Sequence, residues 1–177
     1  TAMHGVGTET IQRVFLKAGF QSPILVDAQA APDPDFPTVA FPNPEEPGAI
    51  DLALETAKAF DARLVIANDP DADRCAAAVN DPVTGWRMLR GDELGAIFAE
   101  SIARKIESGI FANSIVSSSI VRKIAAHYKL DFKETLTGFK WLAKIENLSF
   151  GYEEALGYAV DAMTVNDKDG ISAAITL

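Results

Sequence analysis

The chain has 177 residues, 48% hydrophobic and 23% charged, which suits a globular protein with one large or two small domains. Its formal net charge of −9 argues against a nucleic-acid surface. No apolar run is long enough to cross a membrane, and we expect no signal peptide. The single cysteine, Cys75, excludes an internal disulfide and favours a cytoplasmic setting.

Helix and strand patterns alternate before residue 68. In chain order they are a helix from Thr8, as its cap, to Lys17, a strand Pro23–Val26, a helix Ala49–Phe60 and a buried parallel strand Arg63–Ala67. The stretch from Ala28 to Gly48 holds six of the nine prolines, so it cannot be regular helix or central strand. A long ordered loop of this kind is usually functional.

The second part of the chain repeats this alternation. The predicted elements are strands Cys75–Val79 and Arg87–Leu89, a helix from Asp92 to about Ile106, strand Ser114–Ser117, helix Ile120–Tyr128, strand Phe132–Thr135, helix Phe139–Ile145 and strand Leu148–Tyr152. We place the domain boundary at Ser108–Gly109. The prediction is therefore two consecutive three-layer α/β domains with mixed, mainly parallel sheets, over residues 1–108 and 109–177.

The stretch Asn68–Arg74 carries the strongest chemical signal. Asp69, Asp71 and Asp73 follow an apolar strand at alternate positions, at the edge where α/β sheets place their active sites. Three close carboxylates repel one another unless a cation lies between them, and oxygen-only ligands suit Mg²⁺. Arg74 adds a guanidinium that can grip a phosphate.

Other interpretations of this stretch are weaker. A solvated acidic turn is the plainest alternative, because Asp and Pro are ordinary turn residues. An EF-hand needs Gly at its sixth position and Glu at its twelfth, where this chain has Arg74 and Asn80. An aspartyl-phosphate phosphatase, with a strand-end Asp-x-Asp nucleophile, stays open as a third possibility.

Four further stretches each combine a glycine turn with polar groups that suit a sugar phosphate. They are TAMHGVG at residues 1–7, TGFK at 137–140, GYEEALGY at 151–158 and DKDG at 167–170. Each is weak alone. Together, in this order and with the acidic DPDADR and FPNPEE stretches, they resemble the α-D-phosphohexomutase superfamily, most closely its phosphopentomutase and glucose-1,6-bisphosphate synthase branch.

The resemblance implies roles for individual residues. Asp69, Asp71 and Asp73 would bind one Mg²⁺, and Asp73 would also lie at the substrate. Arg74 would support catalysis from beside the phosphate. The residues implied to contact the sugar phosphate are Thr137, Gly138, Glu153, Ala155 and Lys168, with Glu153 on the hydroxyls and Lys168 on the phosphate. Ala155 lacks the hydroxyl that hexose mutases commonly have there, and His4 receives no role.

The resemblance also implies that parts of the machinery lie elsewhere. The family's catalytic serine stands in a TASHNP-type loop of domain 1, which this sequence does not contain, and Ser117–Ser119 does not replace it. The chain does not begin with Met and stops inside a predicted helix from Gly170, so we expect domains 2 and 3 of a larger protein, with domains 1 and 4 as partners.

The implied activity is a phosphosugar mutase. A phosphoserine would exchange its phosphoryl group with a sugar phosphate through a sugar bisphosphate, which also serves as activator, with Mg²⁺ as cofactor. The competing prediction is a metal- and phosphosugar-binding module without catalysis. We expect the isolated chain to be inactive, with no nucleic-acid or membrane partner.

Overall fold

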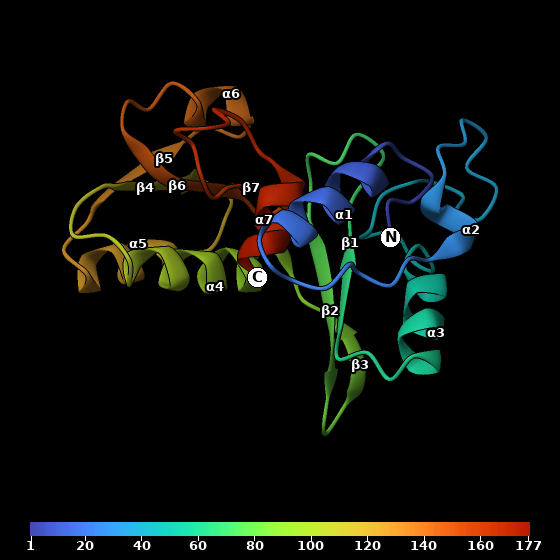
Figure 1. Cartoon of the computed structure of the whole chain (residues 1–177). Helices are drawn as coiled ribbons and strands as arrows, with labels where there is room; N and C mark the ends of the chain where they lie inside the picture. The colour runs from blue at the N-terminus through green and yellow to red at the C-terminus, as the bar shows by residue number, and fades with distance from the viewer. The chain divides into compact units, whose positions relative to one another are not determined.

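The computed structural model describes all 177 residues and divides them into two compact units, Thr1–Leu89 and Arg90–Leu177. Each unit combines helices with a β-sheet, which confirms the α/β fold class (Figure 1). No helix has the length and hydropathy to cross a membrane. The longest, α4 (Gly91–Ala103), is about 20 Å long, against a hydrocarbon thickness of about 30 Å.

The predicted boundary at Ser108–Gly109 is wrong, because the units divide after Leu89. Helix α4 is part of the second unit, where it packs on α5 (Ile120–His127) and on β6 (Leu148–Glu153). Gly95 of α4 permits this packing, since a Cβ there would lie 2.5 Å from the Tyr152 ring. Local sequence signals such as Ser-Gly cannot show which sheet a helix covers.

The first unit contains a small antiparallel sheet. Its strands are β1 (Leu64–Ala67), β2 (Ala76–Asp81) and β3 (Gly85–Met88), in that order across the sheet. Helix α3 (Asp51–Ala59) lies beside it (Figure 1), and Ala53 and Ala57 pack on Val65. The other helices of this unit are α1 (Gly7–Lys17) and the short α2 (Asp27–Ala30).

Three details of the first unit differ from the predictions. Strand β1 pairs antiparallel with β2, because the eight residues between them reverse the chain without a crossover helix. On its other edge, the Thr1 amino group donates to Ile66 and Asn68 N–H donates to the Thr1 carbonyl, the pattern of a parallel ladder. Residues 23–26 form no strand. Thr8 caps no helix, since its hydroxyl donates to the Ala30 carbonyl.

The second unit is a three-layer α/β/α arrangement. The strands of its sheet are β5 (Asp131–Thr135), β4 (Ile110–Ser114), β6 and β7 (Gly157–Ala159), in that order across the sheet. Strand β4 runs parallel to both β5 and β6, whereas β7 runs antiparallel to β6. Helices α4 and α5 cover one face and α6 (Phe139–Leu142) covers the other (Figure 1). Helix α7 (Gly170–Thr176) contacts β7, a strand that the sequence analysis missed.

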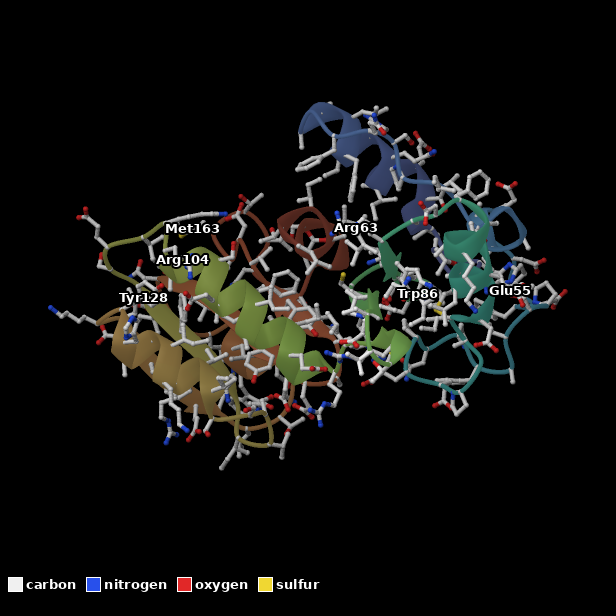
Figure 2. The ribbon with its side chains drawn as sticks, turned by 90° about the horizontal axis from the view of Figure 1, so that it is seen from below. Glu55, Arg63, Trp86, Arg104, Tyr128 and Met163 are labelled. Atoms are coloured by element: carbon white, nitrogen blue, oxygen red, sulfur yellow. The ribbon has the colours of Figure 1, made fainter.

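Aromatic side chains fill the core between this sheet and α4. Phe98 of α4 meets Tyr158 edge to face with 4.9 Å between ring centroids, and Phe111 meets Phe150 at 5.5 Å. On the surface, Tyr128 after α5 donates to Glu100 of α4 at 2.8 Å, and Arg104 lies in the same cluster (Figure 2). The core therefore joins α4 to the sheet, and the surface cluster joins α4 to the end of α5.

Candidate functional site

The acidic loop is closed by its own polar groups at the end of β1. Asn68 Nδ2 donates to the Arg74 carbonyl at 2.7 Å, and Arg74 N–H donates to Asp69 Oδ1 at 3.0 Å. Between these contacts Ala72 takes a left-handed conformation (φ 59°), which lets its N–H reach the Asp69 carbonyl at 2.9 Å. The loop is therefore shaped by its own hydrogen bonds.

The three aspartates of this loop converge. One carboxylate oxygen from each of Asp69, Asp71 and Asp73 lies within 4.8 Å of the other two, close to the roughly 4.2 Å between opposite ligands of an octahedral Mg²⁺. Asp69 is buried, Asp73 is half-buried and Asp71 is exposed. The donor set is thus all-oxygen and open on one side, which fits a Mg²⁺ that also retains waters or phosphate ligands.

The electrostatics of the loop also fit a bound cation. Burial raises the pKa of the Asp69 carboxyl from its ordinary value of 3.8 to about 6; the Arg74 backbone N–H opposes this shift, and the charges of Asp73 and Asp71 add to it. The Arg74 guanidinium Nε is 3.6 Å from Asp69 Oδ2 and its side chain is 37% exposed. A cation between the carboxylates would stabilise their charged forms.

The segment at residues 1–7, which contains two glycines, packs against the acidic loop at Pro70. Val6 N–H donates to the Pro70 carbonyl at 2.8 Å, and a Cβ on Gly5 would lie 2.2 Å from Pro70 Cα. Only glycine permits this approach of two backbones. The TAMHGVG motif therefore contributes by holding Pro70 in the middle of the acidic loop.

His4, which the sequence analysis left without a role, belongs to a partly buried hydrogen-bond network that links the same segment to α2 and the proline-rich loop. Its Nε2 lies 2.7 Å from Thr38 Oγ1, which also accepts from Gln29 Nε2 at 2.9 Å. Thr38 comes from the proline-rich loop and Gln29 from α2. Sequence reasoning missed both residues, because nothing local links them to a histidine about 30 positions away.

A second cluster forms at the turn between β6 and β7 in the second unit. Glu153 Oε1 accepts the Gly138 N–H at 2.6 Å, which joins this turn to the Thr137–Gly138 turn before α6. Gly138 has φ 115°, a conformation that favours glycine. Thr137 and Ala155 are exposed. The structure therefore places next to one another two turns that are fifteen residues apart in sequence.

Lys168 belongs to the same neighbourhood. Its stem packs against the turn, where a Cβ on Gly157 would lie 2.9 Å from Lys168 Cδ. Its ammonium lies 6.0 Å from the centroid of the Phe139 ring and 3.9 Å from Asp167 Oδ1, and its side chain is 22% exposed. All five sugar-phosphate candidates of the sequence analysis thus lie on or beside these adjoining turns.

Sequence reasoning missed the polar groups beneath this turn. Asp92 Oδ1 accepts hydrogen bonds from Ser118 N–H at 2.7 Å and from the Tyr152 hydroxyl at 2.9 Å. Asp92 therefore belongs to this network, and the N-cap residue of α4 is Arg90. Burial and the hydrogen bond to Asp92 hold the pKa of the Tyr152 phenol far above its ordinary range. Glu154 accepts from two serines of the β4 end. The GYEEALGY stretch, which contains Tyr152 and Glu154, and the serine run were the sequence signals close to these groups.

A cavity of about 230 Å³ in the first unit borders the acidic loop at Asn68. It is lined by mainly apolar side chains of α1, α3, β1 and residues 23–26, and none of the three loop aspartates lines it. Its lining offers packing surface and no charged group, so the acidic loop and the β6–β7 turn remain the candidate sites.

Family models match both units of the chain. The model described as phosphoglucomutase/phosphomannomutase, alpha/beta/alpha domain II, matches residues 1–85, and the model for domain III matches residues 90–177. The chain belongs to the phosphoglucomutase/phosphomannomutase family. The gap between the two matched ranges agrees with the division of the structure after Leu89.

Curated relatives are named as several kinds of phosphomutase. A probable phosphomannomutase from Haemophilus influenzae is 51% identical over 99% of this chain and 36% of its own length. A phosphoribomutase from Saccharomyces cerevisiae is 41% identical (99% and 32%), and a human glucose 1,6-bisphosphate synthase is 39% identical (100% and 31%). The chain thus spans about a third of the length of these relatives.

Solved structures of the family share the fold. A putative phosphomannomutase from Thermus thermophilus has a TM-score of 0.82 at 20% identity, over 98% of this chain and 39% of that one. A Paramecium phosphoglucomutase has a TM-score of 0.71 at 24% identity, over 98% and 31%. The family resemblance inferred from the motifs is therefore confirmed, whereas the roles of individual site residues stay predictions.

Proposed function

We propose that this chain supplies the metal-binding and sugar-recognition parts of a phosphosugar mutase. The parent protein would move a phosphoryl group between hydroxyls of a sugar phosphate, through a phosphoserine and a sugar bisphosphate that also acts as activator. The observation that carries the proposal is the meeting of Gly138, Glu153 and Lys168 around one turn of a domain III unit. These groups offer a hydroxyl acceptor and a phosphate partner.

In the first unit we assign Asp69, Asp71 and Asp73 to one Mg²⁺. Their carboxylates supply negative oxygen donors, and the closed loop holds Asp69 in place through the Arg74 N–H. When bound, the metal would neutralise charge on a transferring phosphoryl group. Arg74 would support catalysis beside the same phosphate, because its guanidinium is partly exposed and offers several donors.

In the second unit we assign the sugar to the Thr137–Gly138 turn and the β6–β7 turn. A mutase needs to hold its sugar phosphate in two orientations, since either end of the bisphosphate returns a phosphoryl group. A carboxylate such as Glu153 can accept hydrogen bonds from sugar hydroxyls in both orientations. The Lys168 ammonium can attract the phosphate in both orientations, because it does not require a fixed hydrogen-bond geometry. Ala155 lies at the turn that presents Glu153, so its missing hydroxyl would bear on the choice between pentose and hexose.

The proposal is tested by comparing the full-length parent with this chain. The parent is expected to interconvert the 1-phosphates of ribose, deoxyribose, glucose or mannose with their isomers in the presence of Mg²⁺ and a bisphosphate activator. The isolated chain is expected to bind Mg²⁺ and phosphosugar without turnover. A parent protein that neither binds nor converts any of these sugars would overturn the assignment.

The second candidate, a binding module without catalysis, is favoured by the sequence, which has no TASHNP-type serine loop. Incubation of this chain with a labelled sugar bisphosphate is expected to leave no phosphoserine. An acid-stable label on any serine would contradict the proposed division of labour. A hydroxylamine-sensitive label on Asp69 or Asp71 would instead support an aspartyl-phosphate phosphatase.

A further inference from the structure

Two adjacent glutamates at the end of β6 are held by different parts of the second unit. Glu153 accepts the Gly138 N–H at 2.6 Å, on the side of α6. Glu154 Oε2 accepts the hydroxyls of Ser117 at 2.7 Å and Ser114 at 3.1 Å, at the end of β4. Successive side chains of an extended segment point in opposite directions, so one glutamate cannot take the place of the other.

The contact between Glu154 and Ser117 is reciprocal. Ser117 Oγ donates to the Glu154 carboxylate and accepts the Glu154 backbone N–H at 3.1 Å. One serine side chain therefore fixes both the side chain and the main chain of the residue that lies between Glu153 and Ala155. Hydrogen bonds to a carboxylate are stronger than those between neutral groups, and Ser117 and Glu154 are half-buried.

Contacts with β4 and with the start of α4 restrict the β6–β7 turn at Glu154. Ser114 is fully buried at the end of the inner strand β4, and its Oγ lies 2.8 Å from Ser117 Oγ as well as 3.1 Å from Glu154 Oε2. On another side, Gly91 at the start of α4 lies against the turn, where a Cβ would come 1.7 Å from the Glu154 carbonyl oxygen. The Tyr158 hydroxyl donates to the Gly91 carbonyl at 3.1 Å. Strand and helix thus hold Glu154 from two directions.

We propose that Ser117 and Glu154 are a positioning pair for sugar recognition. They set the place of Glu153 and Ala155 and thereby influence which sugar phosphate the site prefers. Neither residue is assigned a contact with the substrate, and both act through the β6–β7 turn. This inference rests on the proposed function, because it assigns the specificity of that same site to residues behind it.

The test uses Ser117→Ala, with Ser117→Thr as the variant that keeps the hydroxyl. Ser119→Ala is the matched control, because Ser119 is exposed in the same loop and its side chain caps nothing. In the full-length enzyme, Ser117→Ala is expected to lower kcat/KM for the preferred sugar by about tenfold, mainly through KM, and to change the ratio between pentose and hexose phosphates by more than about threefold. Ser117→Thr is expected to restore both values.

A second measurement follows the turn in this chain by itself. Amide hydrogen exchange of residues 154–157 is expected to quicken by about tenfold or more in Ser117→Ala and to match the wild type in Ser119→Ala. Mg²⁺ affinity is expected to stay within about twofold, because the acidic loop belongs to the other unit. If Ser117→Ala fails to fold, Glu154→Gln, which keeps the shape of the side chain, is measured in the same way.

Two results overturn the inference. One is unchanged hydrogen exchange at residues 154–157 in the folded variants. The other is faster exchange with the same ratio between sugars as the wild type, which would make the pair structural only. Failure of the proposed function would look different, because the wild-type parent would then show no phosphosugar turnover while the hydrogen-exchange contrast between Ser117→Ala and Ser119→Ala persists.

Discussion

Replacing Asp71 with asparagine tests the metal site with little change to the fold. Asp71 is exposed, whereas Asp69 holds the acidic loop through the hydrogen bond from Arg74 N–H. Asparagine keeps the size of the side chain and removes one charge from the three-carboxylate set. The substitution therefore separates the affinity for Mg²⁺ from the shape of the loop.

The expected loss follows from the removal of a charged ligand. Such partners contribute about 1.5–3 kcal/mol, so the Kd for Mg²⁺ should rise roughly tenfold to over a hundredfold. At Mg²⁺ near 100 times its Kd, the wild-type chain gains about 2.7 kcal/mol from the ion, whereas a site weakened a hundredfold gains about 0.4 kcal/mol. For a chain of this size, the Mg²⁺-dependent rise in Tm should shrink from about 5–11 °C to about 1–2 °C.

The metal-free chain should respond in the opposite direction. Two carboxylate charges no more than 4.8 Å apart repel one another by at least about 0.9 kcal/mol in water, and Asp71 has two such neighbours. Without Mg²⁺, Asp71→Asn should therefore unfold at a temperature no lower than the wild type. A variant that loses Mg²⁺ binding simply because it is misfolded would instead unfold earlier.

Calorimetric titration with Mg²⁺ and thermal unfolding with and without a chelator measure both quantities. The control is Glu55→Gln, an exposed residue of α3 that changes net charge by the same amount (Figure 2). An unchanged Kd in Asp71→Asn would refute the assignment. An equal loss in Glu55→Gln would show that Mg²⁺ responds to net charge and not to a site.

Four further outcomes are expected. In the full-length enzyme, Lys168→Ala should raise KM for every sugar phosphate roughly tenfold or more, since all carry the phosphate; a change confined to one sugar in kinetic assays would contradict its role. Glu153→Gln should alter the ranking among sugars, and Ala155→Ser should move preference toward hexose phosphates, both read as ratios of kcat/KM; identical ratios would place recognition elsewhere. Gly5→Ala should lower the free energy of unfolding by about 1–3 kcal/mol and weaken Mg²⁺ binding, because its Cβ would lie 2.2 Å from the Pro70 backbone. Denaturant titration measures the loss of stability, and a fully stable variant would refute this packing argument.

Local patterns were sufficient to predict the acidic loop and most of the elements. The apolar run before Asn68 and the alternate aspartates after it are close in sequence, so the three carboxylates could be expected to converge, as they do. The acidic loop depends on contacts within a few residues, for which chain spacing is a good guide. The Thr137–Gly138 turn and Glu153 were instead identified through the family resemblance of their motifs.

Long-range packing decided what the sequence analysis missed or misplaced. Helix α4 belongs to the second unit because Gly95 admits the Tyr152 ring, a contact between residues 57 positions apart. Residues 23–26 have the composition of a strand but no strand partner in the sheet. A segment forms a strand only where it can pair with and pack against neighbouring strands, and the fold decides which segments are neighbours.

The same distinction holds within the candidate sites. The sequence by itself determined which residue types are present and that glycine turns accompany them. Only the tertiary structure joined Glu153 to Gly138, and Glu154 to Ser117 across 37 positions. Hydrogen-bond partners so distant in sequence are brought together by the parallel pairing of β4 with β5 and β6, whose strand ends lie at one edge of the sheet.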